Sequence, residues 1–122
     1  MAKRPVDLNQ LYGQRYVVTT DRESAMGPRD RDPWLCQIVT RTGLVYPHSA
    51  THLGVQVDGH PKLARRLARM GYPLIQDGDA EKTFLVPAGD LERIAPLIKP
   101  YRRRKYKDAA ARAARLVARA RR

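Results

Sequence analysis

The residues best suited to binding chemistry are basic and lie near the end of the printed sequence. After Asp108, a suitable helix N-cap, the sequence is built almost entirely of Ala and Arg, which favour a helix. A helix would align four guanidinium groups on one face, because they are three or four residues apart: Arg112, Arg115, Arg119 and Arg122. An acid-free row of arginines fits a row of nucleic-acid phosphates. The alternative is a solvated tail that only aids solubility.

A second basic cluster precedes this segment, with an aromatic ring on either side of its main part. The basic members are Arg102, Arg103, Arg104, Lys105 and Lys107. Tyr101 and Tyr106 are interleaved with them, which suits stacking on unpaired bases. Alternatively, the same two rings pack against the globular domain.

The segment 61–70 repeats the pattern on a smaller scale. Pro61 favours a helix start, Gly71 favours a stop, and apolar residues at helical spacing predict a core-facing side: Leu63, Leu67 and Met70. The opposite side carries only bases: Lys62, Arg65, Arg66 and Arg69. This side either faces phosphates or is an ordinary solvated helix face.

Candidate catalytic and metal-ligating residues form no recognised pattern. The candidates are His48, His52, His60 and Cys36, with the acidic pairs Asp21–Glu23, Asp30–Asp32 and Asp77–Asp79. Pro47 and the strand pattern after His52 argue against a helix that would bring His48 and His52 together. The acids lie in turn-rich segments, where Asp is favoured for backbone hydrogen bonding. We therefore expect no metal, no cofactor and no catalytic residue.

Composition limits the class of protein. The 122 residues suffice for one domain, and 24 Lys and Arg against 12 Asp and Glu give a net charge of +12. Residues 1–98 hold 13 bases and 11 acids, whereas residues 99–122 hold 11 bases and one acid, so the excess is concentrated near the end. The single cysteine excludes an intramolecular disulfide. Without a secretory signal or an apolar run of about 20 residues, we expect a cytoplasmic protein with no membrane partner.

Hydrophobic periodicity and turn residues predict an α+β body. Strands are expected over 16–20, 34–40, 44–46, 52–58, 72–76 and 82–86, and helices over 61–70 and 88–98. The order is thus β-β-β-β-α-β-β-α, with a hairpin turn at Asp77-Gly78 and with Pro96 weakening the last helix. We expect a small antiparallel sheet with helices on one face.

These patterns divide the chain into an N-terminal arm (1–12), an α+β domain (13–99) and a basic helical extension (100–122). The function predicted first is non-enzymatic nucleic-acid binding, to DNA or RNA, mainly through the extension and within a larger nucleoprotein assembly. One alternative is a protein-interaction module whose sheet face and loop 21–33 contact a protein, while the tail contacts an acidic partner. A second alternative is a small metal-dependent nuclease.

Overall fold

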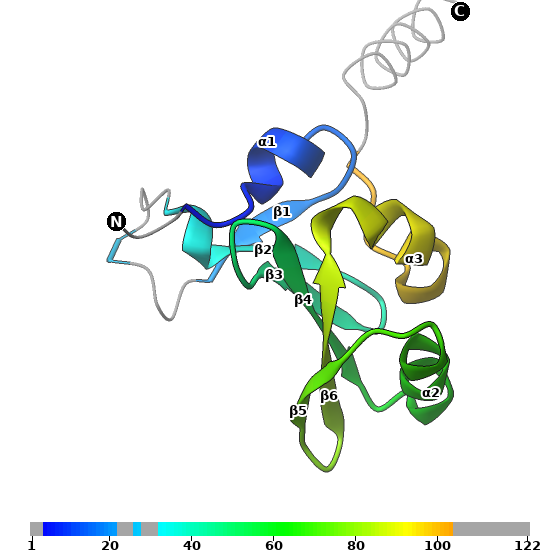
Figure 1. Cartoon of the computed structure of the whole chain (residues 1–122). Coiled ribbons are helices and arrows are strands. Elements are labelled where there is room, and N and C mark those ends of the chain that lie inside the picture. Colours follow the sequence, from blue (N-terminus) through cyan, green and yellow to red (C-terminus); the bar gives the residue numbers. More distant parts are fainter. Residues whose placement is uncertain (1–3, 22–25, 28–31, 104–122) are drawn as a thin grey trace, which may run out of the picture.

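A computed structural model describes residues 4–21, 26–27 and 32–103 (Figure 1). The described residues form six strands, three α-helices and two 3-10 turns. In chain order these are α1 (Leu8–Tyr12), β1 (Val18–Thr20), η1 (Pro33–Leu35), β2 (Cys36–Val39), β3 (Gly43–Pro47), β4 (His52–Asp58), α2 (Pro61–Arg69), β5 (Leu74–Asp77), β6 (Glu81–Pro87), η2 (Ala88–Asp90) and α3 (Leu91–Ile98). The basic residues predicted from Arg104 onward, Tyr106 included, lie outside the described residues.

The six strands make one antiparallel sheet in the order β1-β2-β3-β4-β6-β5, which confirms the α+β class. The arrangement differs from the predicted β-β-β-β-α-β-β-α order in two ways. A helix, α1, precedes the first strand, and the last two strands are exchanged in the sheet, so that β6 lies beside β4. Burial explains the exchange, because β6 carries the buried Phe84 and Val86, whereas every residue of β5 is exposed and suits an edge.

Three predicted strands begin two residues later in the structure, one of them the strand expected at 72–76, which begins at Leu74. The strand expected at 34–40 begins only at Cys36, because Pro33 starts a 3-10 turn and the Asp32 carboxylate accepts a hydrogen bond from the Trp34 N–H at 3.0 Å. The strand expected at 16–20 begins at Val18. Tyr16 instead forms an isolated bridge with Arg102.

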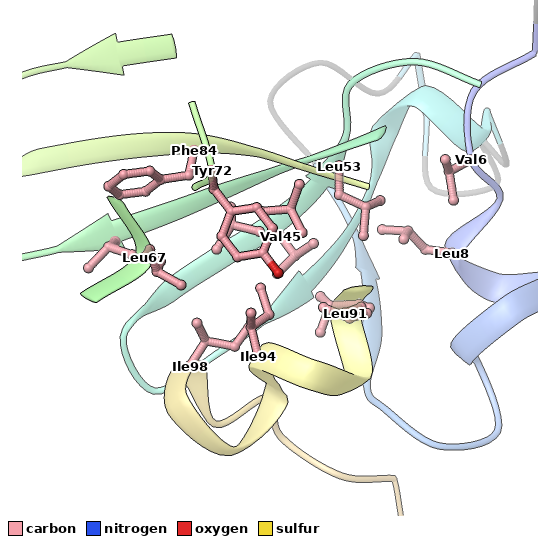
Figure 2. Close-up of a cluster of buried hydrophobic side chains, with 14 of the residues drawn as sticks. Val6, Leu8, Val45, Leu53, Leu67, Tyr72, Phe84, Leu91, Ile94 and Ile98 are labelled. Carbon is pink, nitrogen blue, oxygen red and sulfur yellow. The ribbon is translucent and has the colours of Figure 1, made fainter. Parts of the chain in front are cut away.

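The core lies on one face of the sheet, between the strands and the helices. Val45, Val55 and Phe84 are paired across β3, β4 and β6, so their side chains point the same way. Figure 2 shows Leu67 of α2 and Ile94 of α3 converging on this face. The prediction for the α2 face holds, since Leu67 is fully buried and Leu63 and Met70 pack against the core.

The first described residues also contribute to the core. Asp7 caps α1, its carboxylate accepting a hydrogen bond from the Gln10 N–H at 3.1 Å. Val6 and Leu8 are buried and lie beside Leu53 and Leu91 (Figure 2). A five-residue helix is too short to produce a recognisable hydrophobic period, and the sequence pattern predicts no element there. The proposed division of the chain into arm, domain and extension stays a prediction.

The opposite face of the sheet carries mainly uncharged polar and apolar side chains, and the paired Asp58 and Glu81 add acids at one end of it. Tyr46 pairs with Gly54, and Gly54 in turn pairs with Leu85 on the same face. Gly54 is needed here, because a Cβ atom at this position would lie 2.2 Å from Cζ of Tyr46. The flanking positions hold Gln37 and Gln56. The interaction-module alternative would use this face, and it stays a prediction.

Candidate nucleic-acid interface

The residues that follow α3 are hydrogen-bonded to the first two strands. Lys99 ends α3 in the left-handed conformation, with φ of 55°, and its N–H donates to Ala95 O at 2.8 Å. The Tyr101 N–H then donates to Val39 O at 3.2 Å, and Tyr101 O accepts from the Val17 N–H at 2.9 Å. Both backbone groups of Tyr101 are therefore bonded, one to the residue before β1 and the other to the last residue of β2.

Arg103 continues this contact. Its backbone N–H donates to Arg15 O, and its guanidinium Nη1 donates to Gly13 O, both at 2.9 Å. In Figure 1 the segment, in orange, passes the blue connection between α1 and β1. Two of the predicted phosphate-binding residues of the basic cluster, Arg102 and Arg103, are thus held against the residues before β1 by backbone contacts. Both are exposed.

Two neighbouring clefts meet at Arg41 and Lys99, which line both. The first cleft, of about 400 Å³, is also lined by Tyr101 and Arg102 and has a partly apolar wall that includes Pro96. The second, of about 510 Å³, lies against the start of α2 and includes His60 and Lys62. No acidic residue lines either cleft. We refer to them as the paired clefts.

Cations in the paired clefts have no acidic partner among the described residues. The ion pairs in this part of the chain join Arg15 to Glu92 at 2.6 Å and Lys82 to Asp77, and none involves Arg41, Lys99 or Arg102. The guanidinium carbon of Arg41 lies 5.9 Å from the centroid of the Tyr101 ring, a cation–π contact. Uncompensated positive charge at an acid-free cleft attracts anions.

The exposed face of α2 extends the same positive surface. All four of its bases are exposed, while Ala64 and Leu67 are buried. Arg65 Nε donates to Pro61 O at 3.3 Å, and Lys62 belongs to the second of the paired clefts. Arg66 and Arg69 lie in the last turn, where positive charge also stabilises the helix dipole, so a purely structural role accounts for part of the pattern.

Sequence reasoning missed Arg41 and Lys99. Arg41 is an isolated base in a turn, and nothing in the sequence distinguishes it. The Arg41 N–H donates to Lys99 O at 3.0 Å, and this long-range pairing brings the two residues together. The one sequence feature that pointed to Lys99 is its position at the start of the basic segment, where Lys99 is followed by Pro100.

The described histidines and acids do not form a metal site. In the part of the chain that the structure describes, no three His, Cys, Asp or Glu side chains gather where they would hold a metal ion. His52 Nδ1 lies 2.8 Å from the Thr51 hydroxyl, His60 precedes α2 without a side-chain capping bond, and Asp77 pairs with Lys82. Asp30 and Glu23 lie outside the described residues.

Over the described ranges, the helices are too short or too polar to cross a membrane. The fold and site thus define a small α+β protein with acid-free basic clefts at one end of its sheet. Comparison with protein-family models, with curated proteins and with solved structures finds no match to this chain.

Proposed function

We propose that this protein binds nucleic acid through its phosphates and catalyses no reaction on it. The observation that carries the proposal is the continuous acid-free surface from Arg102 through Arg41 and Lys99 to Lys62. Eight further bases and a single acid follow this surface in residues 104–122. A positive surface of this kind suits a polyanion better than it suits an isolated acidic side chain.

Arginine supplies two of the four bases of this surface, Arg41 and Arg102, and it favours phosphate as a ligand. Its planar guanidinium offers paired donors that match two phosphate oxygens, and it keeps its charge at any physiological pH. Phosphate contacts carry no sequence information by themselves. Binding through this surface is therefore largely independent of sequence, and its strength falls steeply with salt as counterions are released.

Salt-dependent binding by matched full-length variants tests the proposal. One variant carries Arg41→Gln, Lys99→Gln and Arg102→Gln, and a second carries Arg112→Gln, Arg115→Gln and Arg119→Gln. The control carries Arg4→Gln, Lys82→Gln and Arg93→Gln, which removes the same charge from outside the surface. Affinity for labelled DNA and RNA, single- and double-stranded, is measured from 50 to 300 mM KCl, where ~1 unit of log–log slope is expected per lost contact.

We expect both test variants to bind more weakly and to show shallower salt slopes than the control. A test variant that behaves like the control removes its segment from the interface. If both behave like the control, or if the wild type binds none of the nucleic acids, the proposal is overturned. Circular dichroism confirms that each variant is folded.

A further inference from the structure

We propose that Tyr101 is a stacking platform for an unpaired base, so that the protein prefers single-stranded to double-stranded nucleic acid. This inference rests on the proposed function and specifies its ligand. The ring is an exposed aromatic side chain, 47% accessible, at the edge of an acid-free basic cleft. Aromatic rings beside basic residues are the usual means by which proteins bind single strands without reading their sequence.

The backbone that carries the Tyr101 ring is held in place before any ligand arrives. Its backbone N–H and C=O are bonded to Val39 and Val17, Pro100 restricts the chain before it, and Arg103 is anchored two residues later. These bonds fix the position of the Tyr101 Cα atom beside the cleft. A preorganised platform loses little conformational entropy when a base stacks on it.

The surroundings of the ring supply the other parts of a nucleotide site. Arg41 contacts the ring through its guanidinium, and Lys99 and Arg102 border the same cleft, where they would meet the phosphates on either side of a stacked base. Pro96 and Ala95 add apolar surface for the edge of a base. The volume of about 400 Å³ is within the range for small-molecule sites, so the cleft is large enough for one base.

The preference for single strands follows from the state of the bases. In a duplex each base is already stacked and paired, and extracting one costs unstacking energy. In a single strand a base reaches Tyr101 at little cost. Phosphate contacts to Arg41, Lys99 and Arg102 are open to both kinds of ligand, so only the stacking contact discriminates between them.

Three labelled 12-mer ligands separate stacking from phosphate binding in the full-length protein. They are oligo-dT, an abasic sugar–phosphate strand of the same length, and the oligo-dT·oligo-dA duplex, each followed by fluorescence anisotropy at fixed salt. Wild-type protein should bind oligo-dT at least ~5-fold more tightly than the abasic strand, and more tightly than the duplex. Tyr101→Leu should abolish that difference without changing affinity for the abasic strand, and Tyr101→Phe should retain it.

Trp34→Leu is the matched control, because Trp34 is also 47% exposed but belongs to neither of the paired clefts. It should behave like wild type. If Tyr101→Leu keeps the preference for oligo-dT, or if the wild type binds the abasic strand and oligo-dT equally, the inference is wrong. Equal binding of the abasic strand and oligo-dT would overturn the inference and leave the proposed function standing, whereas binding to no ligand would overturn both.

Discussion

The hydroxyl of Tyr16 donates a hydrogen bond to the carboxylate of Glu92, 76 residues later in the chain, with 3.1 Å to each oxygen. The neighbouring Arg15 forms a 2.6 Å ion pair with the same carboxylate. Tyr16 is only 2% exposed, while the Glu92 side chain stays 47% exposed. The contact joins the segment before β1 to α3, and Tyr16 also lines the first of the paired clefts. The contact therefore ties one lining residue of the first cleft to α3.

Tyr16→Phe removes the hydroxyl and keeps the buried ring. We expect a loss of ~1 kcal/mol in the free energy of unfolding, because one partly buried hydrogen bond to a charged group is lost. Urea denaturation at neutral pH measures it. Tyr101→Phe is the control, since no hydrogen bond of its hydroxyl is recorded among the described residues, and it should unfold at the wild-type midpoint. Identical midpoints for all three proteins would contradict this account of Tyr16.

Alkaline pH should destabilise the fold through the same tyrosine. Burial, and then the hydrogen bond to Glu92, raise the pKa of Tyr16 above its ordinary value of 10.0. The folded state thus favours the neutral phenol, so this stabilisation is complete below pH 10 and is lost as pH rises through the raised pKa. Burial likewise raises the pKa values of Tyr12 and Tyr72.

The test compares urea midpoints at pH 8 and above pH 10. Wild-type protein should lose stability over this interval, and Tyr16→Phe should lose less, because it no longer contributes a titrating group. A loss of equal size in both proteins would show that Tyr16 does not contribute to the alkaline transition.

Gly54→Ala should displace the Tyr46 ring. The new Cβ atom would lie 2.2 Å from Cζ of Tyr46, and such overpacking costs about 1–3 kcal/mol. Combining the change with Tyr46→Ala should make most of this cost disappear, as a double-mutant cycle measures. Gly89→Ala is the control, because no atom lies within 4 Å of its added Cβ. Additive effects of Gly54→Ala and Tyr46→Ala would show that the two residues do not interact.

Lys99→Gly should raise stability and lower affinity for nucleic acid. Lys99 is the one non-glycine residue with positive φ in the described part of the chain, and glycine adopts this conformation without strain. Glycine at a left-handed helix end is expected to add up to ~1 kcal/mol to the free energy of unfolding. The same change removes a cation shared by the paired clefts.

Lys99→Gln separates the two effects, since it removes the charge and keeps the side chain. It should weaken binding as much as Lys99→Gly does and leave the unfolding midpoint unchanged. Wild-type affinity in both variants would remove Lys99 from the interface. A lower midpoint for Lys99→Gly would show that the left-handed conformation is not strained.

Local patterns were enough to predict much of the fold. The alternation of Leu53, Val55 and Val57 predicts β4, and the split of α2 into basic and apolar faces follows from helical spacing. The Asp77-Gly78 turn predicts the hairpin of β5 and β6. These features succeed because neighbouring residues fix them. The roles proposed for the basic residues in nucleic-acid binding stay predictions.

The sequence by itself determined the charge distribution and the local elements, because both are properties of residues near one another in the chain. Only the tertiary structure placed β6 against β4, Tyr101 beside Val17 and Val39, and Arg41 beside Lys99. Each of these placements depends on backbone pairing between residues far apart in sequence, and no local periodicity encodes which partner is chosen. Because those long-range pairings form the paired clefts, no local sequence pattern indicates that Arg41 lines them.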